Sequence, residues 1–167
     1  MRIHIIGGSG SGKSYLAELL CQKYNIKHYD LDDLFWLKES GQYGIRMPED
    51  RRTEMLSKIL ATDGWVMEGV YFDWLDDSFT QADRILLLDT PLWLCRIRIC
   101  RRFLHRRLHP EERKNQETWH SFFSLLKWTA KYQRKNMPLI RQKLHKYTQK
   151  VTVIHTCADL SRFADTL

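Results

Sequence analysis

A glycine-rich loop near the start of the chain constrains the fold more than any other feature. The segment Gly7–Tyr15 reads GGSGSGKSY and follows residues 2–6, RIHII, which read as a strand. A glycine, four residues and then Gly12-Lys13-Ser14 is the spacing of a phosphate-binding P-loop. Such a loop wraps backbone N–H groups around phosphate, and the helix that opens at Lys13 adds the positive end of its dipole. The pattern predicts a strand, a loop and a helix that together hold ATP or GTP.

In this interpretation, different residues of the loop contact different parts of the nucleotide. Lys13 contacts the β and γ phosphates, and the hydroxyl of Ser14 is a ligand of Mg²⁺. The backbone amides of residues 10–14 form the cradle for the phosphates. The expected nucleotide-binding residues are Gly7, Gly10, Ser11, Gly12, Lys13, Ser14 and Tyr15.

Strand and helix patterns alternate along the chain. Strands are expected at residues 2–6, 26–29, 65–68, 84–89 and 151–155, and helices at 13–24, from 48 to about 60, from 91 through a run of arginines, from about 111 to 147 and at the C-terminus. This alternation predicts an α/β fold of three layers with a mainly parallel sheet. At 167 residues the chain suits one domain, residues 1–167. A stripe in the long helical region is expected in the core: Trp119, Phe122, Phe123, Leu126, Trp128 and Tyr132.

Composition and charge narrow the classes of protein. No apolar run is long enough to span a bilayer, and MRIHIIGG lacks the apolar core of a signal peptide, so we expect a cytoplasmic protein without a membrane partner. The formal net charge is +7, and residues 96–114 hold seven Arg and one Lys against two Glu, a local charge of +6. Such a concentrated basic segment favours one particular anionic partner. The cysteines form no CxxC pair and are expected to be reduced thiols: Cys21, Cys95, Cys100 and Cys157.

Four segments carry a resemblance to a known family: GGSGSGKS, HYDLDDLFW, WVMEGVY and ADRILLLDTPLWLCRIRICRR. In this order they resemble the adenylate-kinase-related P-loop proteins labelled DNA topology modulation proteins. The resemblance covers nearly the whole chain, with specific motifs up to Arg102. It implies a nucleoside-monophosphate-kinase type of fold: a five-stranded parallel sheet, helices on both faces, an acceptor region after the second strand and a helical lid at about residues 98–116.

An acidic stretch follows the second expected strand, where an open α/β sheet places its ligand crevice. Asp32 matches the Leu-Asp of the family before Leu-Phe-Trp, and we expect it to orient an acceptor hydroxyl and take its proton. Asp30 suits the N-cap of a turn. Phe35 and Trp36 fit a wall of the acceptor pocket and simple core packing equally well.

Mg²⁺ needs a second anchor beside Ser14, and two carboxylates compete. Asp89 ends the segment RILLLD, which has the sequence pattern of a Walker B site, an apolar strand followed by Asp. Because it precedes Thr90-Pro91, Asp89 also suits a helix cap. The resemblance places the strand that ends at Glu68 beside the P-loop strand, where this carboxylate reaches the metal through water, and we favour Glu68. Related sequences more often read Asp-Gly-Asn-Tyr here, and Ser or Thr at the position of Tyr15, so this chain departs from the family pattern at both places.

The arginine run supplies the expected lid, whose tip is marked by Pro110-Glu111-Glu112. Arg98, Arg102 and Arg106 are four residues apart and share one helix face. Arg98 and Arg102 match arginine positions of the family. A fixed guanidinium stabilises the charge that phosphoryl transfer spreads over the moving group. The expected catalytic residues are Lys13, Asp32, Arg98 and Arg102.

Two functions fit these features. The first is a kinase that moves the γ-phosphoryl group of ATP or GTP, with Mg²⁺, to a small nucleotide, nucleoside or other hydroxyl acceptor, most simply an anionic one. The second is a nucleotide-dependent, nucleic-acid-binding regulatory protein, in which the basic segment grips phosphates and ATP switches the conformation. DNA or RNA binding that weakens steeply with salt would favour the second. The acceptor, the choice between ATP and GTP and the oligomeric state stay open.

Overall fold

A five-stranded parallel sheet forms the centre of the protein. The computed structural model describes residues 1–37, 44–109, 118–156 and 159. The strand order is β2-β3-β1-β4-β5, with β1 (Arg2–Gly7), β2 (Lys27–Asp30), β3 (Trp65–Gly69), β4 (Arg84–Leu88) and β5 (Val151–Ile154). Because β1 is central and pairs with both β3 and β4, the loop after β1 opens between the carboxyl ends of its two neighbours. The predicted α/β fold with a five-stranded parallel sheet is confirmed.

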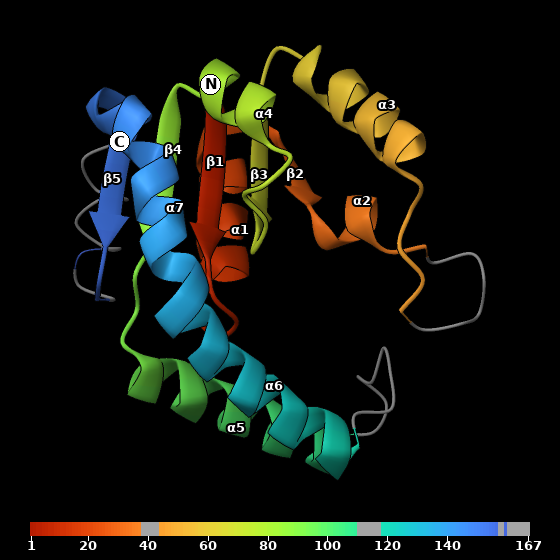
Figure 1. Cartoon of the computed structure of the whole chain (residues 1–167), viewed down its shortest axis with the longest axis vertical. Helices are drawn as coiled ribbons and strands as arrows, with labels where there is room; N and C mark the ends of the chain where they lie inside the picture. The colour runs from red at the N-terminus through yellow and green to blue at the C-terminus, as the bar shows by residue number, and fades with distance from the viewer. Residues whose placement is uncertain (38–43, 110–117, 157–158, 160–167) are drawn as a thin grey trace.

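Helices cover both faces of this sheet (Figure 1). On one face α1 buries Leu16 and Leu20 against Ile3 and Ile5 of β1. On the other face residues of α3, α4 and α7 pack around Ile6 and its neighbours. Successive side chains of a strand point to opposite faces, so one short apolar strand serves two cores. The helical segments are α1 (Lys13–Tyr24), α2 (Asp32–Phe35), α3 (Glu49–Leu60), α4 (Asp76–Gln81), α5 (Leu92–Leu108), α6 (Trp119–Lys131), the π-helical turn η2 (Tyr132–Asn136), α7 (Met137–Leu144) and the 3₁₀ turn η3 (His145–Lys150).

The helices α5 and α6 lie side by side beyond the carboxyl ends of the strands and extend away from the sheet (Figure 1). Phe103 of α5 stacks on Phe122 of α6, with ring centroids 4.3 Å apart. Since α6 packs mainly on this one helix, only a narrow side of it is covered. The prediction that the aromatic stripe lies in the core is therefore wrong for Trp119, Phe123 and Trp128, which are exposed.

The long helix expected from about residue 111 to 147 is interrupted by η2. Pro138, near the start of α7, has no N–H to donate to the carbonyl of Arg134, and its ring crowds that carbonyl, so the helix reorganises just before it. The turn places Tyr132 against the sheet, where its hydroxyl donates to the carbonyl O of Val70 at 3.0 Å. A Cβ on Gly8 of the P-loop would lie 3.2 Å from the ring of Tyr132.

Other differences from the expected elements are small. α2 and α4 were not predicted, because helices of four and six residues are too short to show a 3.6-residue period. The expected lid tip at 110–112 and the expected C-terminal helix lie outside the described residues. Within the described ranges, no helix is both long and apolar enough to cross a membrane.

Candidate active site

Two glycines with positive φ give the P-loop its shape. Gly10 has φ +75° and Gly12 has φ +104°, values that side chains with a Cβ rarely adopt. A Cβ on Gly10 would lie 2.6 Å from the carbonyl O of Cys95 on α5. A Cβ on Gly7 would lie 2.8 Å from the carbonyl O of Leu88 on β4. The loop is packed so closely between β4 and α5 that positions 7 and 10 both require glycine.

The carbonyl groups of the loop are bound from the side of α5. Nη1 of Arg98 donates to the carbonyl O of Ser11 at 2.7 Å and of Gly10 at 3.2 Å. Thr90 donates its hydroxyl to the carbonyl O of Ser11 at 3.1 Å. In a trans peptide the N–H points away from the carbonyl, so the bonds to Ser11 turn the amide of Gly12 to the opposite side, while the N–H of Ser11 donates to the carbonyl O of Gly8 at 3.3 Å. The buried hydroxyl of Ser11 has no partner among the described residues, and this combination fits a cradle for phosphate oxygens.

Lys13 is buried at the start of α1, and its ammonium group donates to the carbonyl O of Gly8 at 3.1 Å. Burial lowers the pKa of this amine, while the negative charges of Glu68, Asp32 and Asp30 act in the opposite direction. A cation that is largely removed from water gains more from an anionic ligand than an exposed lysine would. The position of Lys13 therefore fits contact with nucleotide phosphates.

Ser14 and Glu68 meet at the carboxyl edge of the sheet. The hydroxyl of Ser14 donates to Oε1 of Glu68 at 2.6 Å, and Nζ of Lys13 lies 4.0 Å from Oε2. Nε2 of His28 lies 3.8 Å from the same carboxylate. The described residues hold no group of three or more His, Cys, Asp or Glu that could bind a metal ion by themselves. Mg²⁺ needs no such group, because it usually takes one or two protein oxygens and completes its shell with water and phosphate, which these two side chains suit.

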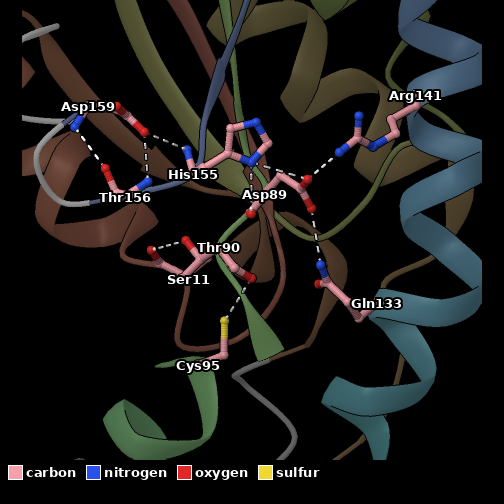
Figure 2. Close-up of polar contacts among 9 residues, drawn as sticks. All are labelled: Ser11, Asp89, Thr90, Cys95, Gln133, Arg141, His155, Thr156 and Asp159. Carbon is pink, nitrogen blue, oxygen red and sulfur yellow. Dashed lines mark hydrogen bonds and ion pairs between the residues drawn. The ribbon is translucent and has the colours of Figure 1, made fainter. Parts of the chain in front are cut away.

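Asp89, the competing carboxylate, belongs to a different cluster (Figure 2). It accepts a 3.0 Å hydrogen bond from Nε2 of Gln133 and forms an ion pair with Arg141. Nδ1 of His155 lies 3.4 Å from its carboxylate. Asp89 also does not cap α5, since the residue at the cap is Pro91 and no side chain bonds the first turn. The structure brings Glu68, and not Asp89, to Ser14.

The acidic stretch after β2 lies beside Glu68. Asp30 is opposite Glu68 in the register of β2 and β3, and its Oδ1 accepts the N–H of Asp32 at 2.9 Å. This bond agrees with the expected turn role of Asp30. Burial raises the pKa of the Asp30 carboxyl to about 6, and the charges of Glu68 and Asp32 add to the effect. Asp32 is exposed and accepts a 2.7 Å hydrogen bond from the hydroxyl of Tyr71, whose pKa is raised by burial and by this bond.

Aromatic rings and two arginines lie next to the acidic stretch. Phe35 stacks on Tyr71 with ring centroids 4.3 Å apart. The guanidinium of Arg52 on α3 lies 4.5 Å from the ring centroid of Trp74, and that of Arg46 lies 5.5 Å from the centroid of Phe35. Nε of Arg52 and Nε1 of Trp74 are buried without a hydrogen-bond partner in the described part of the chain. These donors, which lie in segments without a recognisable motif and which we did not single out from sequence, suit an anionic group of a ligand.

The two arginines expected to be catalytic have different surroundings. Arg98 is half-buried and bonds to the P-loop, whereas Arg102, one turn further along α5, is exposed. Arg102 lines a shallow surface pocket with Arg101, His105 and Arg106. Tyr15, expected to contact the nucleotide, projects into solvent from the first turn of α1. The structure therefore brings Arg98, Lys13, Ser14 and Glu68 together around the loop.

Sequence comparison identifies two relatives, and no family model matches the chain. The chain is 25% identical over 162 residues to the uncharacterized protein YqaC of Bacillus subtilis (strain 168), a match covering 95% of this chain and 83% of that protein. It is 34% identical to adenylate kinase 2 of Nostoc sp. (strain PCC 7120), over a segment covering 41% of this chain and 46% of the kinase. The similarity to an adenylate kinase is thus confined to part of both chains.

Two solved structures share the fold over nearly the whole chain. Shikimate kinase from Bacteroides thetaiotaomicron has a TM-score of 0.58 at 16% identity, covering 99% of this chain and 97% of that one. Shikimate kinase from Acinetobacter baumannii, solved in complex with shikimate, has a TM-score of 0.59 at 16% identity, covering 99% and 89%. At this identity the likeness shows the fold alone. The chain is a P-loop protein with a kinase-like fold, and its resemblance to DNA topology modulation proteins stays a prediction.

Proposed function

We propose that the protein is a kinase that transfers the γ-phosphoryl group of ATP, with Mg²⁺, to a small anionic nucleotide, nucleoside or other hydroxyl compound. The observation that carries this proposal is the 2.6 Å contact between Ser14 and Glu68, next to the buried ammonium of Lys13. A P-loop alone would suit any nucleotide-binding protein. Here the pair lies beside the carboxyl groups of Asp30 and Asp32, which gives the site an acceptor side as well as a nucleotide side.

The nucleotide side uses residues of the P-loop and of β3. When bound, Mg-ATP supplies the phosphoryl group, with its charge partly neutralised by the metal. Lys13 exchanges its bond to the carbonyl of Gly8 for phosphate oxygens, and Ser14 and Glu68 hold the metal directly or through water. Arg98 keeps the carbonyl of Ser11 turned away, so that the amide of Gly12 stays directed at the phosphates. ATP and GTP are both compatible with these contacts.

The acceptor side uses the acidic stretch and the arginines beside it. Asp32 orients the hydroxyl of the acceptor and takes its proton. The carboxyl group of Asp30 lies beside Asp32 and accepts its N–H. Arg52 and Arg46 hold the anionic part of the acceptor, since their stacking on aromatic rings leaves guanidinium N–H groups for hydrogen bonds. Arg102 stabilises the charge on the moving group from α5. We propose these roles from position and chemistry together.

The test is the rate of ADP formation from Mg-ATP without acceptor and with a panel of nucleosides, nucleoside monophosphates and hydroxy acids that includes shikimate. One acceptor should raise the rate sharply in the native protein and not in Lys13→Ala. Lys23→Ala, at an exposed position of the same helix, is the matched control and should keep the rate. A rate that no acceptor changes, but that DNA or RNA alters, would favour the nucleic-acid-binding function instead.

A further inference from the structure

One side of α5 carries an exposed row of apolar side chains. Trp93, Ile97, Leu104 and Leu108 are 64%, 47%, 55% and 76% exposed, and Cys100 between them is half-buried. Steps of four, three, four and four residues separate the members, close to the heptad pattern of paired helices. We call these five residues the apolar row.

The apolar row lies on the side of α5 that the rest of the described chain leaves uncovered. The buried residues of this helix are Cys95, Ile99 and Phe103. Cys95 and Ile99 contact the P-loop at Gly10, and Phe103 stacks on Phe122 of α6. The nucleotide site and the partner helix α6 therefore occupy one side of α5, while the row faces away from both. The apolar row thus has no part in the proposed kinase chemistry.

The width of the row distinguishes between possible occupants. At about 100° per residue around a helix, its five members span about 80°. A helix that lies on a core presents a stripe of about 100° or more, and a strict heptad row is the narrower seam of two paired helices. A helix that binds a bilayer surface also buries a broad apolar face. The row is therefore shaped for one other helix.

The charges beside the row define the partner further. Arg96 and Arg101 flank Ile97 at the places that carry salt bridges between paired helices. α5 contains six Arg and no Asp or Glu. Two copies of α5 paired with one another would bring arginine against arginine, which disfavours a second copy of this chain as the occupant. Charge complementarity instead calls for glutamate or aspartate in the flanking positions of the partner.

We propose that the apolar row of α5 docks an amphipathic, acidic helix of a partner protein. Apolar side chains of that helix cover Ile97 and Leu104, and its carboxylates pair with Arg96 and Arg101. The docked helix lies on the back of the helix that holds Arg98 against the P-loop. This places a protein-binding surface and the nucleotide site on opposite sides of one element.

The test uses a designed peptide of about four heptads with Ile and Leu in the seam and Glu in the flanking positions. Its labelled form should bind the full chain saturably, and the affinity should fall as salt is raised. Ile97→Glu combined with Leu104→Glu should weaken binding at least about tenfold, the loss expected when buried apolar contacts are replaced by charge. Leu139→Glu, at an exposed leucine of α7, is the matched control and should bind like the native chain.

Charge exchange makes the test specific. The variant that combines Arg96→Glu with Arg101→Glu should no longer bind the Glu peptide. It should instead bind a peptide with Lys in the same flanking positions. Equal binding of Glu and Lys peptides by the native chain, or no binding of the Glu peptide, would overturn the proposal. Anionic vesicles or an oligonucleotide that bind in place of the peptide, and lose affinity in the Ile97 and Leu104 variant, would also overturn it. Circular dichroism and a thermal melt check that each variant is folded.

Discussion

Ser14 and Glu68 are joined by a 2.6 Å hydrogen bond although they lie 54 residues apart in the sequence. The bond links the first turn of the helix after the P-loop to the neighbouring strand. Both oxygens lie at the carboxyl edge of the sheet, next to the ammonium group of Lys13. The proposed metal site therefore depends on the pairing of β1 with β3 as much as on the loop itself.

Glu68→Gln should weaken the dependence of nucleotide binding on Mg²⁺. Loss of the carboxylate charge is expected to raise the Mg²⁺ concentration for half-maximal effect by about 10- to 100-fold, the usual cost of changing a group that supports a metal. Titration of a fluorescent ATP analogue, with and without Mg²⁺, measures this. Asp89→Asn is the control and should leave the Mg²⁺ dependence unchanged. The opposite result would move the metal site to Asp89.

Gly10→Ala should destabilise the protein more than Gly44→Ala. Both glycines have positive φ, so either substitution costs about 1 kcal/mol of backbone strain. A Cβ on Gly10 would also meet a backbone carbonyl at 2.6 Å, whereas a Cβ on Gly44 meets nothing within 4 Å. Urea unfolding without nucleotide should show an additional loss of about 1–3 kcal/mol for Gly10→Ala. Equal losses would show that the loop can move away from α5.

Asp32→Asn should lower kcat with the cognate acceptor and leave KM nearly unchanged. Removal of a positioned base typically costs about 10²- to 10⁴-fold in rate. Asp33→Asn changes the next exposed carboxylate and should retain the rate. If Asp30→Asn lost the rate and Asp32→Asn did not, the base would be the carboxyl group on β2 instead. Steady-state kinetics of the three variants decides between the two.

Arg98 and Arg102 should affect different kinetic constants. Arg98 holds two carbonyl groups of the P-loop, so Arg98→Met should weaken ATP binding, seen directly by calorimetry. Arg102, one turn further along α5, is exposed, so Arg102→Met should leave ATP binding intact and lower kcat. Loss of about tenfold or more in each constant is the expected size for a charge-assisted contact. Two variants with the same phenotype would contradict this division.

His4 should make stability depend on pH. The ring is fully buried on β1, its Nδ1 is 2.6 Å from the hydroxyl of Ser78, and burial lowers the pKa of His4 to about 3. The unfolded chain binds a proton near pH 6.5 and the folded chain does not, so stability is full above pH 6.5 and falls as pH drops towards 3. The slope from this group approaches about 1.4 kcal/mol per pH unit. Urea unfolding of the metal-free protein at pH 7, 6 and 5 tests it.

The matched variants for this measurement are His4→Gln and His120→Gln. His4→Gln removes the titrating ring and keeps a polar group for Ser78, so its stability should vary less with pH than that of the native protein. His120 is exposed on α6, and His120→Gln should leave the slope as it is. A native protein whose stability is flat between pH 7 and 5 would show that water reaches the ring of His4.

The parts of the site that the sequence predicts well are local ones. The spacing from Gly7 to Ser14 needs only neighbouring residues to be recognised, and so do the apolar runs that become strands. The choice of Glu68 over Asp89 needed knowledge of which strand lies beside β1, which the residues alone do not contain. It came from the family resemblance, and the geometry of Ser14 agrees with it.

The parts that the sequence predicts poorly depend on which helices meet. The aromatic residues of α6 have the period of a buried helix, yet Trp119 and Phe123 are exposed because α6 packs on a single neighbour. Arg52 and Trp74 come together from separate segments, and no motif marks either of them. Periodicity reports how apolar one face is, but not how much of that face another element covers.

The π-helical turn η2 makes the length of the chain between α6 and α7 critical. Each residue advances a helix by about 100°, and a π turn accommodates one residue more than an α turn. The side chains before η2 therefore face α5 and those after it face the sheet, although the helical backbone is continuous. A one-residue deletion in η2 would shift these two orientations relative to each other and withdraw Tyr132 from Gly8. We therefore expect related sequences to carry no insertion or deletion in η2, even though no residue of η2 needs to contact a substrate.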